Sequence, residues 1–242
     1  MSEQDSPAAA DGAASLPVRA PESSALRISV RTALILLVFT LVFTGLMAGT
    51  YSLTRPLVEA SAQREKLRLI GEVLPQDSYD NDLLADRVVL PAVPAIGLDA
   101  DTPLYRARKG GEPAALVFEA AAPDGYSGRI GLLVAVRADG RLAAVRVTGH
   151  RETPGLGDYI DPKKDKDKAK PWITQFSGQS FETVPRGQWR VRKDGGRFDQ
   201  RSGATISARA VTNATGRALA WAVERRERLF AAGIGARYAD NP

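Results

Sequence analysis

The sequence predicts an α+β protein, in which a single N-terminal transmembrane helix is followed by one mixed α+β domain. Three observations support this class. A run of 23 uncharged residues occupies positions 32–54, two β-rich runs flank Asp139 and Gly140, and apolar residues recur every three to four positions over 207–230. The 242-residue chain is 44% hydrophobic and 25% charged, which is the composition of a folded protein.

The N-terminal part contains two segments of opposite character. Residues 1–26 are rich in Ala, Ser and Pro without apolar periodicity, so we expect a disordered tail. Residues 27–55 contain the uncharged run, which is long enough to cross a bilayer core of roughly 30 Å at about 1.5 Å per residue. A cleaved signal peptide is the alternative, but its apolar region is shorter, roughly 7–15 residues. Basic residues flank the run on both sides, so they do not set its orientation.

The residues after the span, 56–242, are enough for one well-packed domain. Pro56 can open a helix, and the apolar spacing that follows predicts an amphipathic helix ending before Pro75.

A β-hairpin is the clearest signal inside this domain. Two β-rich runs, 129–137 and 141–148, flank Asp139 and Gly140, the residue types of a two-residue type I′ turn. An earlier strand is expected over 115–119, ahead of the turn residues at 123–125.

Two further segments complete the domain. The lysine-rich stretch 163–170 has mixed charge and is interpreted as a solvated loop, not as a nucleic-acid-binding patch. The apolar spacing over 207–230 predicts an amphipathic helix with arginines near its C-terminus. Strand hairpins followed by a long helix indicate the α+β class. The net charge of +5 is small, and we take its excess of Arg and Lys to be spread along the chain.

The composition also excludes several chemistries. The chain has no cysteine, so it can form no iron–sulfur cluster, c-type haem, disulfide or Cys-ligated zinc site. A His-rich metal site or a Ser-His-Asp hydrolase would depend on His150 alone. Any redox chemistry therefore needs a borrowed cofactor.

A glycine-rich segment leads into the C-terminal helix. The start of a helix presents unpaired N–H groups and the positive end of the helix dipole, which suits a phosphate. Gly203 and Ala204 leave room for an anion, and the hydroxyls of Ser202, Thr205 and Ser207 can donate to it. The alternative is that these hydroxyls only cap the helix, which stabilises it by about 1 kcal/mol.

This segment resembles the flavin-binding subunits that carry FMN covalently, whose pattern is approximately D-x-x-S-G-A-T-x-[ST]. The matching positions are Asp199, Ser202, Gly203, Ala204, Thr205 and Ser207. In that family a separate flavin transferase joins the Thr to the FMN phosphate by a phosphoester bond, so the resemblance implies that Thr205 carries FMN. Arg201 departs from the aliphatic residue common in the family, and Ala208 from a frequent second hydroxyl.

A second stretch, HRETPGLGD at 150–158, resembles the H-x-E-T-P-G-L-G-D signature of the G subunits of Rnf electron transport complexes. WITQF at 172–176 is similar to their W-I-x-Q-F segment. The resemblance places the first stretch beside the flavin, where Glu152 and Thr153 would hydrogen-bond the ring or the ribityl chain and Leu156 would pack on a ring face. The alternative is a structural loop.

The resemblance implies a relay subunit and not a stand-alone enzyme. It would hold covalent FMN and pass electrons between other membrane subunits of a ferredoxin:NAD oxidoreductase while Na⁺ or H⁺ is translocated. It would be a single-pass protein of the bacterial inner membrane, with residues 1–26 in the cytoplasm and 56–242 in the periplasm. Its partners would be the other subunits, the flavin transferase and the lipid bilayer, with no nucleic acid.

Two alternatives stay open at this point. The C subunit of the Na⁺-translocating NADH:quinone oxidoreductase shares the acceptor motif. A membrane-anchored assembly or binding module without a cofactor would use the S-G-A-T segment only as a helix cap. NAD binding is not expected, since no G-x-G-x-x-G follows a strand.

Overall fold

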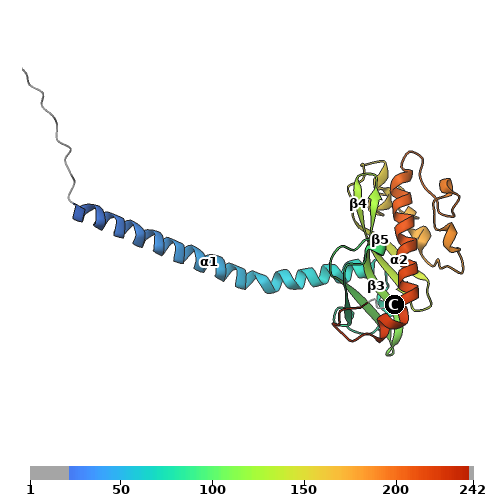
Figure 1. Ribbon diagram of the computed structural model, residues 1–242, viewed down its shortest axis with the longest axis horizontal. Coiled ribbons are helices and arrows are strands. Elements are labelled where there is room, and N and C mark those ends of the chain that lie inside the picture. The colour runs from blue at the N-terminus through green and yellow to red at the C-terminus, as the bar shows by residue number, and fades with distance from the viewer. Residues whose placement is uncertain (1–21, 240–242) are drawn as a thin grey trace, which may run out of the picture. The chain divides into compact units, whose positions relative to one another are not determined.

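The computed structural model describes residues 22–239, and Figure 1 shows its elements in chain order. The chain divides into two compact units, the first ending at Ser61 and the second beginning at Ala62. The predicted tail lies outside the described residues as far as residue 21. Helix α1 begins at Glu22, so the last five residues assigned to the tail are helical instead.

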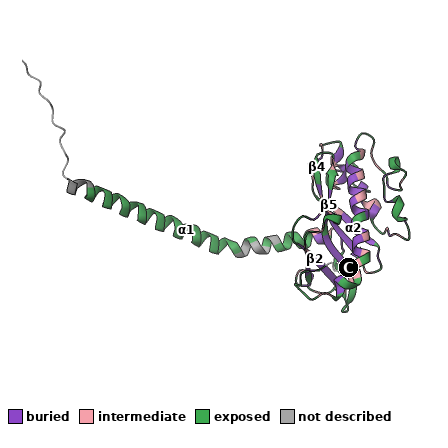
Figure 2. Cartoon of the chain, in the orientation of Figure 1, coloured by how far each residue is buried: buried purple, intermediate pink, exposed green. Residues whose placement is uncertain are grey.

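Helix α1, Glu22–Gly71, contains the apolar run. Its segment Leu26–Arg55 is long and apolar enough to cross a membrane, and none of its most apolar stretch is buried (Figure 2). This agrees with the anchor predicted over 27–55. The prediction of a new helix opening at Pro56 is wrong, because α1 continues through that residue. Proline removes one backbone hydrogen bond, but extending an existing helix is easier than nucleating another.

The globular unit is built on one antiparallel five-stranded sheet in the order β1-β2-β3-β4-β5. Its strands are β1 Arg87–Leu90, β2 Thr102–Lys109, β3 Glu112–Gly125, β4 Gly128–Arg137 and β5 Leu142–Gly149. The hairpin predicted over 129–148 is confirmed as β4 and β5. The strand predicted over 115–119 is the centre of the longer β3, whereas β1 and β2 are not predicted.

Two turns differ from the sequence prediction. The loop between β4 and β5 spans residues 138–141, and the Gly140 N–H donates to the Arg137 carbonyl at 2.9 Å. The turn is therefore centred one residue earlier than a two-residue Asp-Gly turn, with Gly140 at φ 84°. The turn predicted at 123–125 is wrong, because β3 continues to Gly125 and the chain reverses at residues 126–127.

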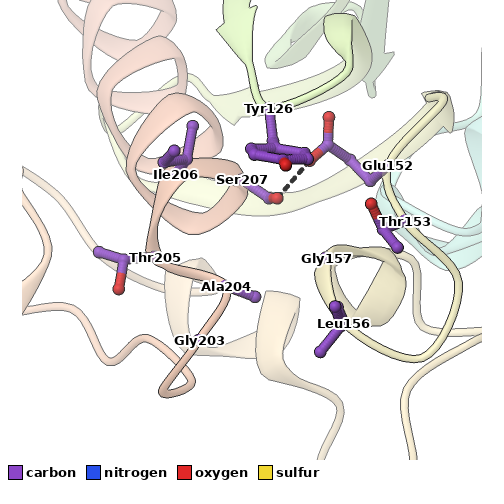
Figure 3. Close-up of a pocket in the computed structure, with 10 residues that line it drawn as sticks. All are labelled: Tyr126, Glu152, Thr153, Leu156, Gly157, Gly203, Ala204, Thr205, Ile206 and Ser207. Atoms are coloured by element: carbon purple, nitrogen blue, oxygen red, sulfur yellow. Dashed lines mark hydrogen bonds between the residues drawn. The ribbon is translucent and has the colours of Figure 1, made fainter.

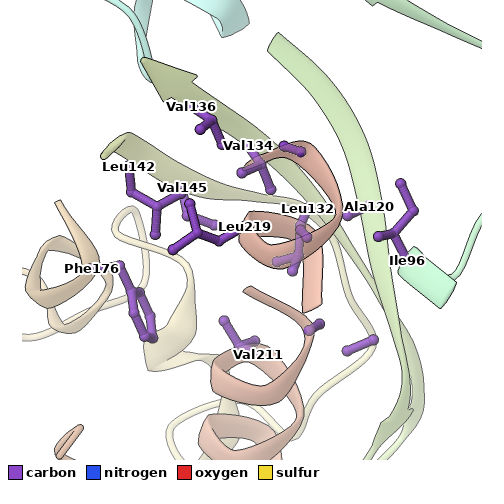
Figure 4. Packing of buried hydrophobic residues seen from close by; sticks show 14 of the residues in the cluster. Ile96, Ala120, Leu132, Val134, Val136, Leu142, Val145, Phe176, Val211 and Leu219 are labelled. Carbon is purple, nitrogen blue, oxygen red and sulfur yellow. The ribbon is translucent and has the colours of Figure 1, made fainter. Parts of the chain in front are cut away.

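Helix α2, Thr205–Ala231, packs against β3 and β4 on one face of the sheet. It confirms the helix predicted over 207–230. Alternate residues of β4 point to this face, where Leu132 and Val134 pack with Leu219 of α2 (Figure 4). The intervening Leu133 joins a second cluster on the other face, which also includes Val73 just beyond the end of α1. Both faces of the sheet are thus covered.

A buried arginine holds the C-terminal end of α2. Arg106 of β2 is 1% exposed and forms an ion pair with Asp86. Its guanidinium also donates to the carbonyl oxygens of Leu229 and Phe230 at 3.1 and 3.2 Å. These carbonyls have no N–H partner further along the helix, so the arginine satisfies them.

The connection from β5 to α2 runs over 150–204 as loops and short 3₁₀ helices. These are Gly157–Ile160, Trp172–Phe176, Arg186–Gln188 and Arg192–Asp194. The loop predicted over 163–170 exposes its lysines, but the interpretation as fully solvated is wrong for Asp165, which is 1% exposed.

Candidate functional site

Three segments that are distant in the sequence enclose one pocket (Figure 3). They are the turn between β3 and β4, the loop after β5 and the N-terminal end of α2, and they leave a cavity of about 240 Å³. Its lining residues are Tyr126, Glu152, Thr153, Leu156, Gly157, Gly203, Ala204, Thr205, Ile206 and Ser207. The structure thus brings together every predicted site residue except Ser202, which is exposed in the turn just before the lining.

The Thr205 hydroxyl is available at the rim of this pocket. Thr205 is the first residue of α2 and is half-buried, and its Oγ1 has no hydrogen-bond partner among residues 22–239. Figure 3 shows its side chain pointing away from Glu152 and Leu156. Ala204 occupies the N-cap position with φ −134° and ψ 43°, and no side chain caps the helix. The alternative in which Ser202 or Thr205 acts as a helix cap is therefore wrong.

The main-chain N–H groups in the first turn of α2 are also unpaired within the described residues. Within the described part of the chain, the N–H groups of Thr205, Ile206 and Ser207 have no acceptor. Gly203 has φ +84°, and a side chain added there would meet no atom within 4 Å. An uncapped helix start with open space beside it, and a hydroxyl at its first position, fits a phosphate group.

The buried carboxylate of Glu152 connects the segments that line the pocket. Ser207 donates its hydroxyl hydrogen to Glu152 Oε2, and the Ser127 N–H donates to Glu152 Oε1 at 3.0 Å. Glu152 is 4% exposed and forms no ion pair with any residue described. A side chain at Gly157 would lie 2.6 Å from Ser207 Oγ. The Ser207 hydroxyl, expected to donate to the phosphate, is thus engaged by Glu152.

Hydrogen bonds of the Tyr159 hydroxyl hold the turn that precedes α2. The Tyr159 hydroxyl accepts the Arg201 N–H at 3.1 Å and donates to the Ala204 carbonyl at 3.3 Å. The Arg201 guanidinium lies 4.7 Å from the centre of the Tyr159 ring and forms an ion pair with the buried Asp165. Burial raises the pKa of Tyr159. Arg201, one of the two departures from the covalent-flavin pattern, therefore helps to position the turn that precedes α2.

The charge of Asp165 is stabilised in place. Burial alone would raise its pKa, but N–H groups of Trp172 and Asp167 and the Arg201 guanidinium together hold that pKa below its ordinary value. The ion pair between Asp165 and Arg201 thus joins the lysine-rich loop to the turn that precedes α2.

Three lining residues, Tyr126, Gly157 and Ile206, are not among the predicted site residues. Tyr126 is 66% exposed on the two-residue turn between β3 and β4. The sequence signal for Tyr126 is an aromatic residue in a tight turn. The sequence prediction misses it because the turn is predicted at 123–125. In the described part of the globular unit, the exposed large hydrophobic residues are Leu67, Tyr126, Leu156, Ile206 and Ile234. Three of these five line this one pocket, which gives it an apolar rim.

This fold and this site define an FMN-binding domain that follows a membrane-type helix. Residues 125–220 match the family described as FMN-binding domain, and residues 25–73 match the RnfG N-terminal region. The chain belongs to the G subunits of ion-translocating oxidoreductase complexes, which are electron transport complexes. The resemblance seen in the sequence is thereby confirmed for this family and not for the C subunits.

The relatives that carry this assignment match most of the chain. The G subunit of the ion-translocating oxidoreductase complex of Pseudomonas aeruginosa (strain UCBPP-PA14) is 46% identical over 87% of this chain and 96% of its own length. That of Cronobacter sakazakii is 45% identical over 76% and 85%. That of Pseudoalteromonas atlantica is 39% identical over 85% and 94%.

Proposed function

We propose that this protein relays electrons through FMN joined by a phosphoester bond to Thr205 Oγ1. The single observation that carries the proposal is the unbonded Thr205 hydroxyl at the open start of α2, beside the pocket. The attachment is compatible with the main-chain geometry, because Gly203 leaves open space there and the first N–H groups of α2 have no acceptor among the described residues and can bind an anion.

The attachment has a definite chemical balance. A bond forms between Thr205 Oγ1 and the flavin phosphorus, the hydroxyl proton is released, and a bond from phosphorus to a leaving group breaks. The donor is therefore an activated FMN ester such as a flavin dinucleotide, which releases a nucleoside monophosphate. No described residue hydrogen-bonds Thr205 Oγ1 to accept the proton. This supports catalysis by a separate flavin transferase.

The pocket residues position the flavin once it is attached. FMN supplies the electron-transfer chemistry, and the protein supplies its position and surroundings. The cavity, about 240 Å³, is smaller than the roughly 300–1,000 Å³ pockets that enclose most ligands, so part of the flavin lies outside it. Tyr126 and Leu156 offer the apolar surface for the ring, while Thr153 and Glu152 supply the polar contacts.

The same proposal includes the cellular arrangement. Helix α1 anchors the chain in the bacterial inner membrane, the tail is cytoplasmic, and residues 56–242 lie in the periplasm with the other subunits. Electrons pass through the protein while the complex moves Na⁺ or H⁺. A covalent link suits this location, because a flavin held reversibly outside the cytoplasm would be lost by dilution, whereas a tethered one keeps a high effective concentration.

The attachment is tested by producing the full chain together with a flavin transferase and recording flavin fluorescence on a denaturing gel. We expect a fluorescent band for the unchanged chain and for Thr153→Ala, a matched change of a hydroxyl in the same pocket. We expect none for Thr205→Ala. A band that persists in Thr205→Ala disproves the acceptor, and the absence of a band from the unchanged chain favours a module without a cofactor.

The orientation is tested with the cysteine-free chain itself. A single cysteine is introduced by Glu112→Cys, at an exposed position of β3, or by Ser15→Cys in the tail. A membrane-impermeant maleimide applied to cells with a permeabilised outer membrane should label the first variant. It should label the second only after lysis, and the reverse pattern contradicts a periplasmic domain.

A further inference from the structure

The positive charge of the chain is concentrated in one segment and not spread along it. Residues 186–228 contain eleven Arg and Lys against four Asp and Glu, while the whole chain has an excess of only five. The rest of the chain is therefore slightly acidic. Such a local excess creates an attractive field for anionic groups.

Much of this charge is exposed and unneutralised. The segment 186–197 lies along α2, to which Asp194 is tied by the Arg209 guanidinium at 2.8 Å (Figure 1). Four exposed cations of the segment 186–228 form no ion pair with any residue from 22 to 239. They are Arg190, Lys193, Arg197 and Arg217.

Two of these cations border a hollow of about 360 Å³, which we call the arginine hollow. Its lining consists of Phe181, Arg186, Trp189, Arg190, Asn213, Gly216, Arg217 and Ala220. The Trp189 ring packs beside Phe181 at 5.6 Å, and the absence of a side chain at Gly216 allows this packing, since a Cβ there would lie 3.0 Å from Trp189 Cβ. The hollow therefore has an aromatic wall and three guanidinium groups at its edge.

One of the three guanidinium groups is held in a fixed position. Arg186 stacks over the Phe181 ring at 4.7 Å and pairs with Glu224 at 2.8 Å. A guanidinium that is already held loses less conformational freedom when it binds a partner. Among the described residues, Glu224 is the one carboxylate paired with a guanidinium of the hollow, so the two other arginines stay unneutralised.

We propose that the arginine hollow is a docking site for an acidic segment of another subunit of the complex. A carboxylate that enters it can accept paired hydrogen bonds from a guanidinium fork. Arginine is also among the side chains that most often anchor protein interfaces. Arg217 follows Thr205 by twelve residues, about 18 Å along α2 at 1.5 Å per residue. A segment docked there lies beside the helix that begins at the flavin acceptor.

The proposal is tested by measuring binding of the full-length protein, in detergent micelles, to the complex purified from a strain that lacks it. The changes are the double charge reversal Arg190→Glu with Arg217→Glu, and a matched control of Arg87→Glu with Arg137→Glu. The control residues are exposed on β1 and β4 and have no ion-pair partner in the described part of the chain. Binding is followed by biolayer interferometry over a range of KCl concentrations.

We expect the dissociation constant of the unchanged protein to rise with KCl. The reversal in the hollow should weaken binding about 10- to 100-fold and flatten the salt dependence, while the control should change binding less than about twofold. Equal weakening by both doubles overturns the proposal, because the effect is then one of net charge. If both bind normally and only the first loses affinity for micelles that contain phosphatidylglycerol, the hollow faces lipid and the proposal is wrong. Thermal unfolding confirms that each variant is folded.

Discussion

The Ser207 hydroxyl donates a hydrogen bond to the Glu152 carboxylate across 55 residues of sequence. This bond joins the first turn of α2 to the loop that follows β5. Because the other carboxylate oxygen accepts the Ser127 N–H, Glu152 connects all three segments of the flavin pocket. The shape of the pocket therefore depends on a residue that is itself almost completely buried.

Removing the donor should destabilise the domain. Ser207→Ala leaves Glu152 Oε2 buried without its hydrogen bond, and such a loss costs about 1–3 kcal/mol in the free energy of unfolding. Ser127→Ala is the matched control, because Ser127 contributes only its main-chain N–H. Urea unfolding of the full chain in detergent, followed by tryptophan fluorescence, measures both. Equal stability of the two variants would show that the bond contributes nothing.

A methyl group at Gly157 should disrupt the same connection. The added Cβ of Gly157→Ala would lie 2.6 Å from Ser207 Oγ and 3.0 Å from Glu152 Oε2. We expect a loss of about 1–3 kcal/mol from overpacking, together with weaker flavin attachment. Gly149→Ala is the control, since a Cβ there meets nothing within 4 Å. The unfolding midpoint and in-gel flavin fluorescence report the two effects, and identical behaviour of both variants contradicts the prediction.

Tyr126 should quench the fluorescence of FMN attached as proposed. An aromatic ring stacked on a flavin lowers its fluorescence, and Tyr126 is the exposed aromatic ring at the pocket rim. Tyr126→Leu should therefore raise the fluorescence of the native protein severalfold but leave the denatured protein unchanged. Tyr51→Leu, in the apolar part of α1, should change neither. If native fluorescence stays the same in Tyr126→Leu while attachment is intact, the ring lies elsewhere.

Stability at acid pH should depend on Asp165. The pKa of its carboxyl is held below the ordinary value of 3.8, so the charged form is favoured in the folded state. Its contribution is complete above that value and is lost as the pH falls through the lower folded-state pKa. Between about pH 5 and pH 3, the unchanged chain should therefore lose more unfolding free energy than Asp165→Asn. Parallel curves for the two proteins would refute this.

The buried arginine of β2 should matter more than an exposed one. Arg106→Met removes the fully buried partner of Asp86 and the donor to the Leu229 carbonyl, while Arg108 still pairs with Asp86 and donates to the Phe230 carbonyl. We expect a loss of about 3 kcal/mol. Arg129→Met removes an exposed ion pair with Asp99 and should cost about 1 kcal/mol or less. Chemical unfolding in detergent compares the two variants, and a similar loss in both would contradict the capping role of Arg106.

The sequence predicts those elements whose patterns are regular. The apolar run of α1, the β4–β5 hairpin and the helical spacing of α2 each repeat over many residues. Strand β2 escapes prediction because Arg106 is a charged residue that points into the core, which breaks the alternation expected of a strand. Strand β1 has only four residues, too few to show a period.

The sequence predicts those site residues that lie within continuous motifs. Thr205 and its neighbours precede a clear helix, and Glu152 follows a clear strand. The bond between Glu152 and Ser207 is not predictable, because no local pattern pairs residues so far apart. The contribution of Tyr126 depends on which two residues form the turn, and Asp165 is buried within a stretch that has a solvent-exposed composition.

The two ends of α2 differ in whether their free main-chain groups are hydrogen-bonded. At the C-terminal end, Arg106 satisfies the carbonyls from within the sheet, whereas the N-terminal end is left uncapped at Thr205. The helix cannot slide along its axis without breaking the hydrogen bonds from Arg106 to the Leu229 and Phe230 carbonyls. With FMN attached at Thr205 as proposed, the position of the flavin along the axis of α2 therefore depends on an arginine at the opposite end of the helix.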